Sequence, residues 1–206
     1  PDIIRIKNTD DITEKYVLLV NSFDGHALKL LFTPVRVVCW NTLLTALASA
    51  YDETIAIYHK GDVQQKLEAA REVLRRTLHY YDRFQAWGNT LADKEITTAS
   101  LNSFLNDLFE VEDEEEVSTQ KRRKMELVKA ILQSERNSIK GIENSWWAVY
   151  NAVAEFADYS LPVRKLAKDP TRRLSSIWFG NAARLKRKAA ELVTSYALSD
   201  TIRSLK

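Results

Sequence analysis

The side chains best suited to binding chemistry in this sequence are the arginines and lysines near its C-terminal end. Residues 161 to 206 include 11 lysines and arginines against three acids, a net charge of +8. The preceding residues are mildly acidic, with 19 basic against 25 acidic side chains. Because clustered cations attract anionic partners, this segregation favours a nucleic-acid-binding surface. The alternative is a solvated helix face that only keeps the protein soluble.

We expect two groups of cations to contact a phosphate backbone. The inner group lies on the predicted sheet and consists of Lys29 and Arg36, which share a face only if a bulge at Thr33–Pro34 shifts the strand alternation. The outer group lies on the C-terminal loop and helix and consists of Arg164, Lys165, Arg172, Arg173, Arg184, Lys186 and Arg187. The same residues are suited to docking an acidic protein surface instead.

Catalytic and metal-binding patterns are weak. A thiol nucleophile at the single cysteine, Cys39, needs a histidine base, but His26, His59 and His79 stand in no local catalytic signature. We therefore interpret Cys39 as a small core residue. The acidic run Glu110–Val117 has no supporting histidine and is interpreted as an exposed linker rather than a metal site. Phosphate-binding glycine loops and zinc motifs are absent from the sequence. We expect no enzymatic activity, no metal and no cofactor.

A small sheet and several long helices must position the cations. The predicted strands are Ile3–Lys7, Tyr16–Phe23, Ala27–Phe32, Val35–Cys39 and Thr54–Tyr58. Asp24–Gly25 is typical of a hairpin turn. Because proline has no N–H, Pro34 should stand at a sheet edge or a bulge.

Apolar residues at helical spacing predict the helices. They are expected at Asn41–Tyr51, Val63–Leu91, Asp93–Phe109, Met125–Ser138, Ser145–Tyr159 and Ser175–Leu198. The aromatic side chains on the second of these are interpreted as core rather than as a base-stacking surface; they are Tyr80, Tyr81, Phe84 and Trp87. The adjacent Trp146 and Trp147 indicate a helix buried on two sides, or one that places a tryptophan at an interface.

The predicted fold class is α+β: a small antiparallel sheet, made of a β-hairpin plus a strand, followed by a helix and then by a mainly helical C-terminal part. We divide the chain into an α+β core over residues 1–110, a charged linker over 111–124 and a basic helical region over 125–206. In the linker, Lys121–Lys124 are suited to pairing with the acidic run, within the chain or across a subunit boundary.

The residues 33–43, T-P-V-R-V-V-C-W-N-T-L, resemble the signature of the phage- and plasmid-like family catalogued as domain of unknown function 932. Weaker features agree in order: Asp24–Gly25, His59 before a long helix, Trp147 followed by Tyr150–Val153, and Phe179–Gly180 before a basic helix. The family name implies no activity. Members extend further at the N-terminus, so we expect this chain, which begins at Pro1, to be part of a longer protein.

A small sheet, a helix and a basic helical flank are also similar, at the level of fold, to phage single-strand annealing recombinases. Those proteins form rings or filaments and hold the DNA backbone in a basic groove. The analogy implies a non-enzymatic phage or plasmid protein that binds single-stranded DNA in recombination or replication, as a homo-oligomer. The alternative is a structural or regulatory mobile-element protein that assembles through protein contacts without DNA. One cysteine and no long apolar run predict a cytoplasmic protein without membrane contact. The resemblance to phage and plasmid proteins implies that this cytoplasm is that of a bacterial host.

Overall fold

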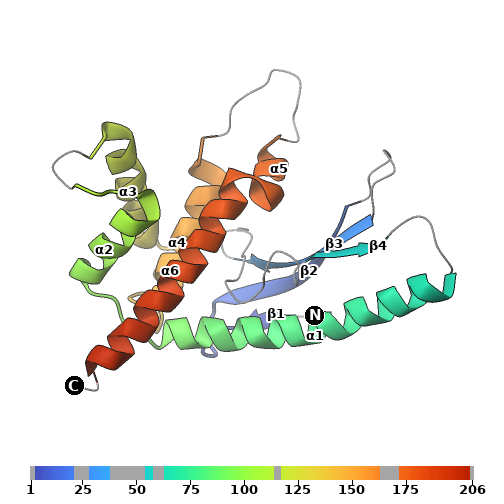
Figure 1. The fold of residues 1–206 in the computed structure, drawn as a ribbon. Coiled ribbons are helices and arrows are strands. Elements are labelled where there is room, and N and C mark those ends of the chain that lie inside the picture. The colour runs from blue at the N-terminus through green and yellow to red at the C-terminus, as the bar shows by residue number, and fades with distance from the viewer. Residues whose placement is uncertain are drawn as a thin grey trace.

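The computed structural model describes residues 3–20, 28–37, 54–57, 63–113, 117–162 and 172–204. Its strands are β1 (Ile3–Arg5), β2 (Ile12–Val20), β3 (Leu28–Arg36) and β4 (Thr54–Ile57). Its helices are α1 (Val63–Ala92), α2 (Thr98–Phe109), α3 (Thr119–Leu132), α4 (Trp146–Glu155), the π-helix η1 (Phe156–Ser160), α5 (Arg172–Phe179) and α6 (Asn181–Ser204). The sheet lies along α1, α4 and α6 pack against the C-terminal half of α1, and α2, α3 and α5 pack on α4 and α6 (Figure 1). The predicted α+β class is confirmed.

The strands form one antiparallel sheet in the order β1-β2-β3-β4. Strands β2 and β3 pair without interruption, from Thr13 opposite Arg36 to Val20 opposite Lys29. The described register therefore has no bulge at Thr33 and Pro34. The shift of alternation that Lys29 and Arg36 need in order to share a face is therefore absent. β4 pairs only with Leu28–Leu31, so Pro34 stands beyond that pairing, at an edge where its missing N–H costs no ladder bond.

Helix α1 delivers its aromatic side chains to the core. Tyr80, Tyr81, Phe84 and Trp87 are all buried, which confirms the core interpretation. Trp87 also donates from Nε1 to Thr194 Oγ1 at 2.9 Å, so its polar atom is satisfied. Among the described residues, no helix is both long and apolar enough to cross a membrane.

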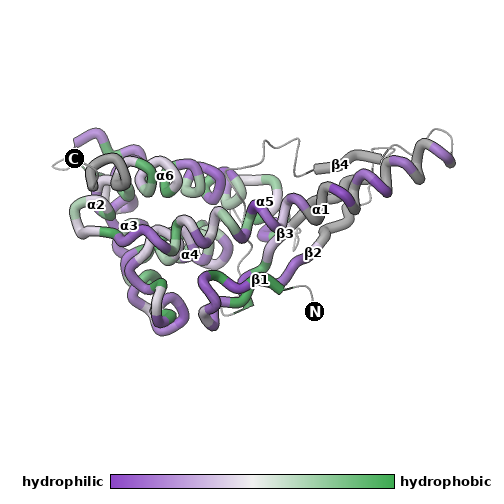
Figure 2. The backbone as a smooth tube through the Cα atoms, turned by 90° about the horizontal axis from the view of Figure 1, so that it is seen from below, coloured by the Kyte–Doolittle hydropathy of each residue, from purple (hydrophilic) through white to green (hydrophobic). Residues whose placement is uncertain are grey.

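Helix α4 is the centre of the helical part. Every one of its residues is buried, including both Trp146 and Trp147, because α1, α3 and α6 all pack against it. This confirms the first of the two interpretations, a helix buried on two sides. The core that forms around it joins Phe84 of α1, Trp147 of α4 and Val193 of α6. Along the helices of Figure 2, hydrophilic and hydrophobic stretches alternate, as amphipathic helices require.

Several helix boundaries differ from the predicted ones for local reasons. α2 begins at Thr98, not Asp93, because Thr97 and Ser100 form a reciprocal capping box. α3 begins at Thr119, capped by the Ser118 side chain, so Lys121–Lys124 are helical. The predicted single C-terminal helix is divided at Gly180 into α5 and α6.

Candidate nucleic-acid interface

Helices α5 and α6 carry most of the predicted cations whose side chains the structure describes. From 172 to 188 the chain has six lysines and arginines and no acid. Gly180 joins the two helices: a Cβ atom there would lie 2.9 Å from the Ser176 Cα atom, so only glycine fits this approach. Ser176 Oγ accepts a hydrogen bond from the Ala182 N–H at 3.3 Å, near the start of α6. The sequence thus builds a tight junction between two basic helices.

A cavity of about 420 Å³ opens at this junction, and we call it the junction hollow. Its lining residues are Pro162, Arg172, Ser175, Ser176, Phe179, Gly180 and Asn181. Arg172, Ser175, Ser176 and Phe179 recur at i, i+3, i+4 and i+7, so they occupy one face of α5. Phe179 is 50% exposed despite its large apolar ring. One face of α5 therefore offers a cation, two hydroxyls and an accessible aromatic ring.

The arginines of α5 and α6 are placed differently from one another. Arg184 is exposed and donates to Asn181 Oδ1, a neutral acceptor that leaves its positive charge in place. Arg172 and Arg187 are half-buried. Arg173 donates from Nη1 to the carbonyl oxygens of Asp158 (3.2 Å) and Leu161 (2.9 Å). Because helix C-termini favour cations, Arg173 fastens α5 to the end of η1.

Lys186 lies inside the protein rather than on the predicted interface. Its Nζ atom is 2.7 Å from Asp158 Oδ1, and the two side chains are 0% and 2% exposed. Burial lowers the pKa of Lys186, and the attraction of Asp158 opposes that effect. A buried, paired ammonium cannot reach a phosphate from this position, so we remove Lys186 from the interface.

Arg36 is also buried and paired. Its Nε atom donates to Asp11 Oδ1 at 2.6 Å and its Nη1 atom to Asn137 Oδ1 at 2.5 Å. The other carboxylate oxygen of Asp11 accepts from Trp147 Nε1 at 2.6 Å. These bonds fasten the end of β3 to the β1–β2 connection, to the segment after α3 and to α4. The predicted sheet-borne phosphate contact is therefore replaced by a structural role, because the guanidinium faces no solvent.

The structure describes few of the remaining predicted residues. Lys29 belongs to β3, where only its backbone is described. Outside the described residues lie Arg164, Lys165, Cys39, His26, His59, the turn Asp24–Gly25, the predicted helix Asn41–Tyr51 and most of the basic loop 161–171. His79 is exposed on α1. Where side chains are described, three or more potential metal ligands do not gather at any point.

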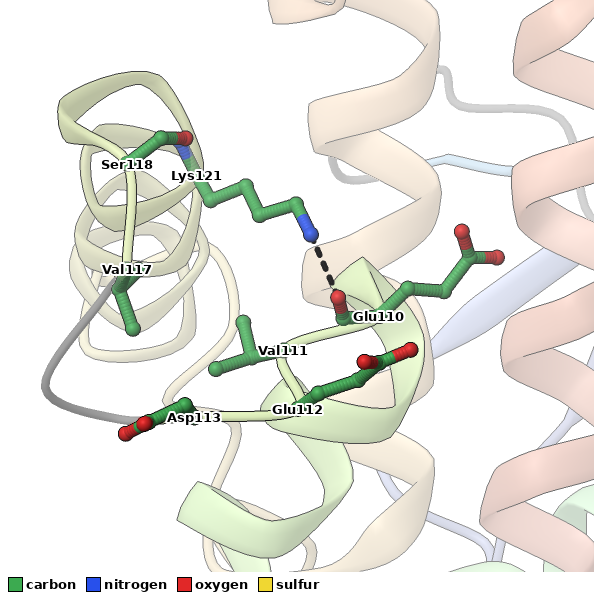
Figure 3. Close-up of a pocket in the computed structure, with 7 residues that line it drawn as sticks. All are labelled: Glu110, Val111, Glu112, Asp113, Val117, Ser118 and Lys121. Atoms are coloured by element: carbon green, nitrogen blue, oxygen red, sulfur yellow. Dashed lines mark hydrogen bonds between the residues drawn. The ribbon is translucent and has the colours of Figure 1, made fainter.

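The acidic run meets the basic helices within the same chain. A cavity of about 480 Å³ lies where they meet. Figure 3 shows its lining residues, which are Glu110, Val111, Glu112, Asp113, Val117, Ser118 and Lys121. Lys121 Nζ donates to the Glu110 carbonyl oxygen at 2.5 Å, so the expected pairing uses the backbone. The Glu110 carboxylate binds Lys188 Nζ of α6 at 2.8 Å, and this hydrogen bond lowers the pKa of Glu110. Lys188 is therefore neutralised at the margin of the basic surface.

The uncharged residues of the junction hollow were not predicted from the sequence, although they add an aromatic ring and hydrogen-bonding groups to its basic side chain. Phe179, Ser175 and Asn181 carry no charge and were not selected. The spacing from Arg172 to Phe179 is the signal that could have found them, because it places a cation and an aromatic ring on one helical face. No local signal pointed to Asp11 or Asp158, which are distant in sequence from the cations they bind.

The comparisons with known proteins concern the family alone. A family model described as a domain of unknown function matches residues 1–178. No curated protein and no solved structure matches the chain. The match includes the signature around Arg36, the buried helix α4 and most of α5. The chain belongs to the family called domain of unknown function 932.

Proposed function

We propose that this chain is a non-enzymatic DNA-binding protein of a phage or plasmid, which binds and anneals single strands in recombination or replication as a homo-oligomer. The observation that carries the proposal is the stretch from 172 to 188, six basic residues with no acid, folded into two helices that meet at an open hollow. Two of the six, Lys186 and Lys188, pair with Asp158 and Glu110. Clustered positive charge of the kind that remains binds phosphates without regard to sequence.

The refined interface is smaller than the predicted one. It consists of Arg172, Arg184 and Arg187, with Arg173 holding α5 in place. Arg36 and Lys186 are left out because their charges are buried and paired. Binding of single strands asks for cations along the backbone path and for aromatic surfaces beside it, and this end of the helical part supplies both.

The alternative function is a structural or regulatory mobile-element protein that assembles through protein contacts and binds no DNA. The exposed apolar side chains of α5 favour it: Leu174 is 57% exposed and Phe179 is 50% exposed. Both functions predict oligomers, so the stoichiometry does not separate them, whereas nucleic-acid binding does.

The deciding experiment measures binding of a labelled single-stranded oligonucleotide across a salt series, with duplex DNA as competitor. The test variant is Arg172→Glu/Arg184→Glu. The matched control, Arg71→Glu/Arg75→Glu, makes the same change of charge on α1, where the side chains are 69% and 70% exposed. We expect tight, salt-sensitive and sequence-blind binding that only the α5–α6 variant loses. Each phosphate contact removed should reduce the salt slope by about one.

Two results would count against the proposal. No binding at about 50 mM salt, where a basic surface should bind, transfers support to assembly without DNA. An equal loss in both double variants shows that net charge, not this surface, attracts the strand. Sedimentation with and without the oligonucleotide tests the homo-oligomer part, which a monomer in both conditions contradicts.

A further inference from the structure

We propose that the junction hollow binds an unpaired nucleobase stacked on Phe179, and that this contact makes the interface prefer single strands to duplex. The inference rests on the proposed function and adds to it a ligand class and a source of selectivity. The basic residues alone would bind any polyanion.

The hollow has the dimensions and surface that a base requires. Its volume of about 420 Å³ falls within the roughly 300–1,000 Å³ of typical small-ligand sites. A phenyl ring left half exposed has an apolar face to offer, and every nucleobase has a π-face that can stack on it. Ser175 and Asn181 on the lining are exposed and carry hydrogen-bonding groups for base edges. These groups are not arranged as a base-specific set, so we expect tolerance of all bases.

One cation lines the hollow and another binds a residue of its lining. Arg172 lies on the same face of α5 as Phe179, two helical turns away. Arg184 is exposed on the first turn of α6 and donates to the side chain of Asn181, which lines the hollow. A strand held by both arginines would carry its bases past the ring. A base in a duplex is paired and stacked between neighbours, and so cannot enter without being extruded.

The charge around the hollow selects this occupant over an apolar protein segment. The acid-free stretch from 172 to 188 contributes every lining residue of the hollow except Pro162, and the phosphates of a bound strand complement its charge. We therefore commit to single-stranded nucleic acid, and make a protein partner an outcome of the test.

The test compares two strands with the same phosphates. One probe is a labelled thymidine oligonucleotide, and the other is an abasic strand of equal length. The test variant is Phe179→Ala, and the matched control is Leu174→Ala, which removes an equally exposed apolar side chain from the same helix outside the hollow. Phe179→Trp keeps an aromatic surface.

We expect the wild-type protein to bind the thymidine strand about tenfold more tightly than the abasic strand, the effect of stacking one base. Phe179→Ala should bind the thymidine strand about tenfold more weakly than the wild-type protein does, and its affinity for the abasic strand should be unchanged. Leu174→Ala should lose nothing, and Phe179→Trp should retain the preference.

The outcomes separate the two proposals. Equal wild-type affinity for both strands overturns the base site while leaving the basic interface standing. Equal losses from Phe179→Ala and Leu174→Ala overturn it too, and indicate a general apolar, protein-docking surface. No binding of either strand at low salt refutes the DNA-binding function itself. If Phe179→Ala does not fold, the wild-type comparison of the two strands decides alone.

Discussion

Replacing Arg36 by methionine should destabilise the protein without changing how DNA binding depends on salt. Methionine keeps the apolar stem of the side chain but removes the guanidinium that binds Asp11 and Asn137. The Asp11 carboxylate then remains buried at 0% exposure and keeps its bond from Trp147 Nε1. It has lost the cation that compensated its charge. A buried charge without its counterion is among the costliest defects in a protein interior.

The expected cost is about 3–5 kcal/mol, the usual effect of removing one partner of a buried ion pair. That is a large part of a total stability of roughly 5–15 kcal/mol. Adding Asp11→Asn to Arg36→Met should recover part of the loss, because the orphaned charge is gone. The matched control is Arg71→Met on α1. Its side chain is 69% exposed and pairs with Glu68, so the change should cost no more than about 0.5 kcal/mol.

Urea unfolding followed by tryptophan fluorescence measures these differences, and the chain has five tryptophans to report them. The same variants are then titrated with single-stranded DNA across a salt series. If Arg36→Met costs less than about 1 kcal/mol and at the same time lowers the salt slope, the arginine contacts phosphate and our structural assignment is wrong. A double variant no more stable than Arg36→Met alone would show that the charge of Asp11 is not the cause.

Three further changes test other parts of the fold. Thr97→Ala removes the capping box of α2 and should cost about 0.5–2 kcal/mol in the same unfolding assay; an unchanged midpoint would contradict the cap. Gly180→Ala forces a Cβ atom within 2.9 Å of Ser176 Cα, a backbone neighbour that cannot move aside, so we expect a loss of about 1–3 kcal/mol and weaker DNA binding. Burial lowers the pKa of Lys186 in the folded protein below the ordinary value of 10.5. At pH values between the lowered pKa and 10.5, Lys186 is therefore protonated in the unfolded chain but neutral in the folded protein. Wild-type stability relative to Lys186→Met should therefore rise with pH in that window, and parallel pH profiles would refute this.

Hydrophobic periodicity predicted the elements that are long and amphipathic. The helix expected over Val63–Leu91 is α1, Val63–Ala92, and its aromatic stripe is buried as expected. Long regular patterns are robust because many apolar residues repeat one signal. The strands were also found with boundaries displaced by a few residues, except that the predicted strands Ala27–Phe32 and Val35–Cys39 are joined in the single strand β3, Leu28–Arg36. The predicted strand starting at Tyr16 in fact begins at Ile12, because polar residues on its first part still pair with β3.

Boundaries set by single polar side chains were harder to predict. α3 was expected from Met125, where apolar residues begin, but its first turns are exposed and are started by the Ser118 cap. The C-terminal helix was expected to be continuous over Ser175–Leu198, but it is divided at Gly180 into α5 and α6. In each case the apolar pattern carries no information, since the deciding contact is a hydrogen bond or a close backbone approach.

Arg36 and Lys186 are buried because each binds a buried acid, Asp11 for Arg36 and Asp158 for Lys186. Helix α4 and η1 are almost wholly apolar in sequence, yet they include the acids Glu155 and Asp158, both buried. Isolated acids in such a helix are rarely buried without a partner, so each requires a cation or a hydrogen-bond donor from elsewhere in the chain.

Each buried acid found such a partner. Glu155 binds Arg136 at 2.8 Å and Asn137, Asp158 binds Lys186, and the buried Asp11 beside α4 binds Arg36. A count of all cations therefore overestimates the number of possible phosphate contacts, because cations that pair with buried acids must be left out of it. Subtracting them leaves the arginines of α5 and α6 as the described candidates for a phosphate backbone. One of those arginines, Arg172, lines the same hollow as the exposed ring of Phe179, and net charge alone does not reveal that ring.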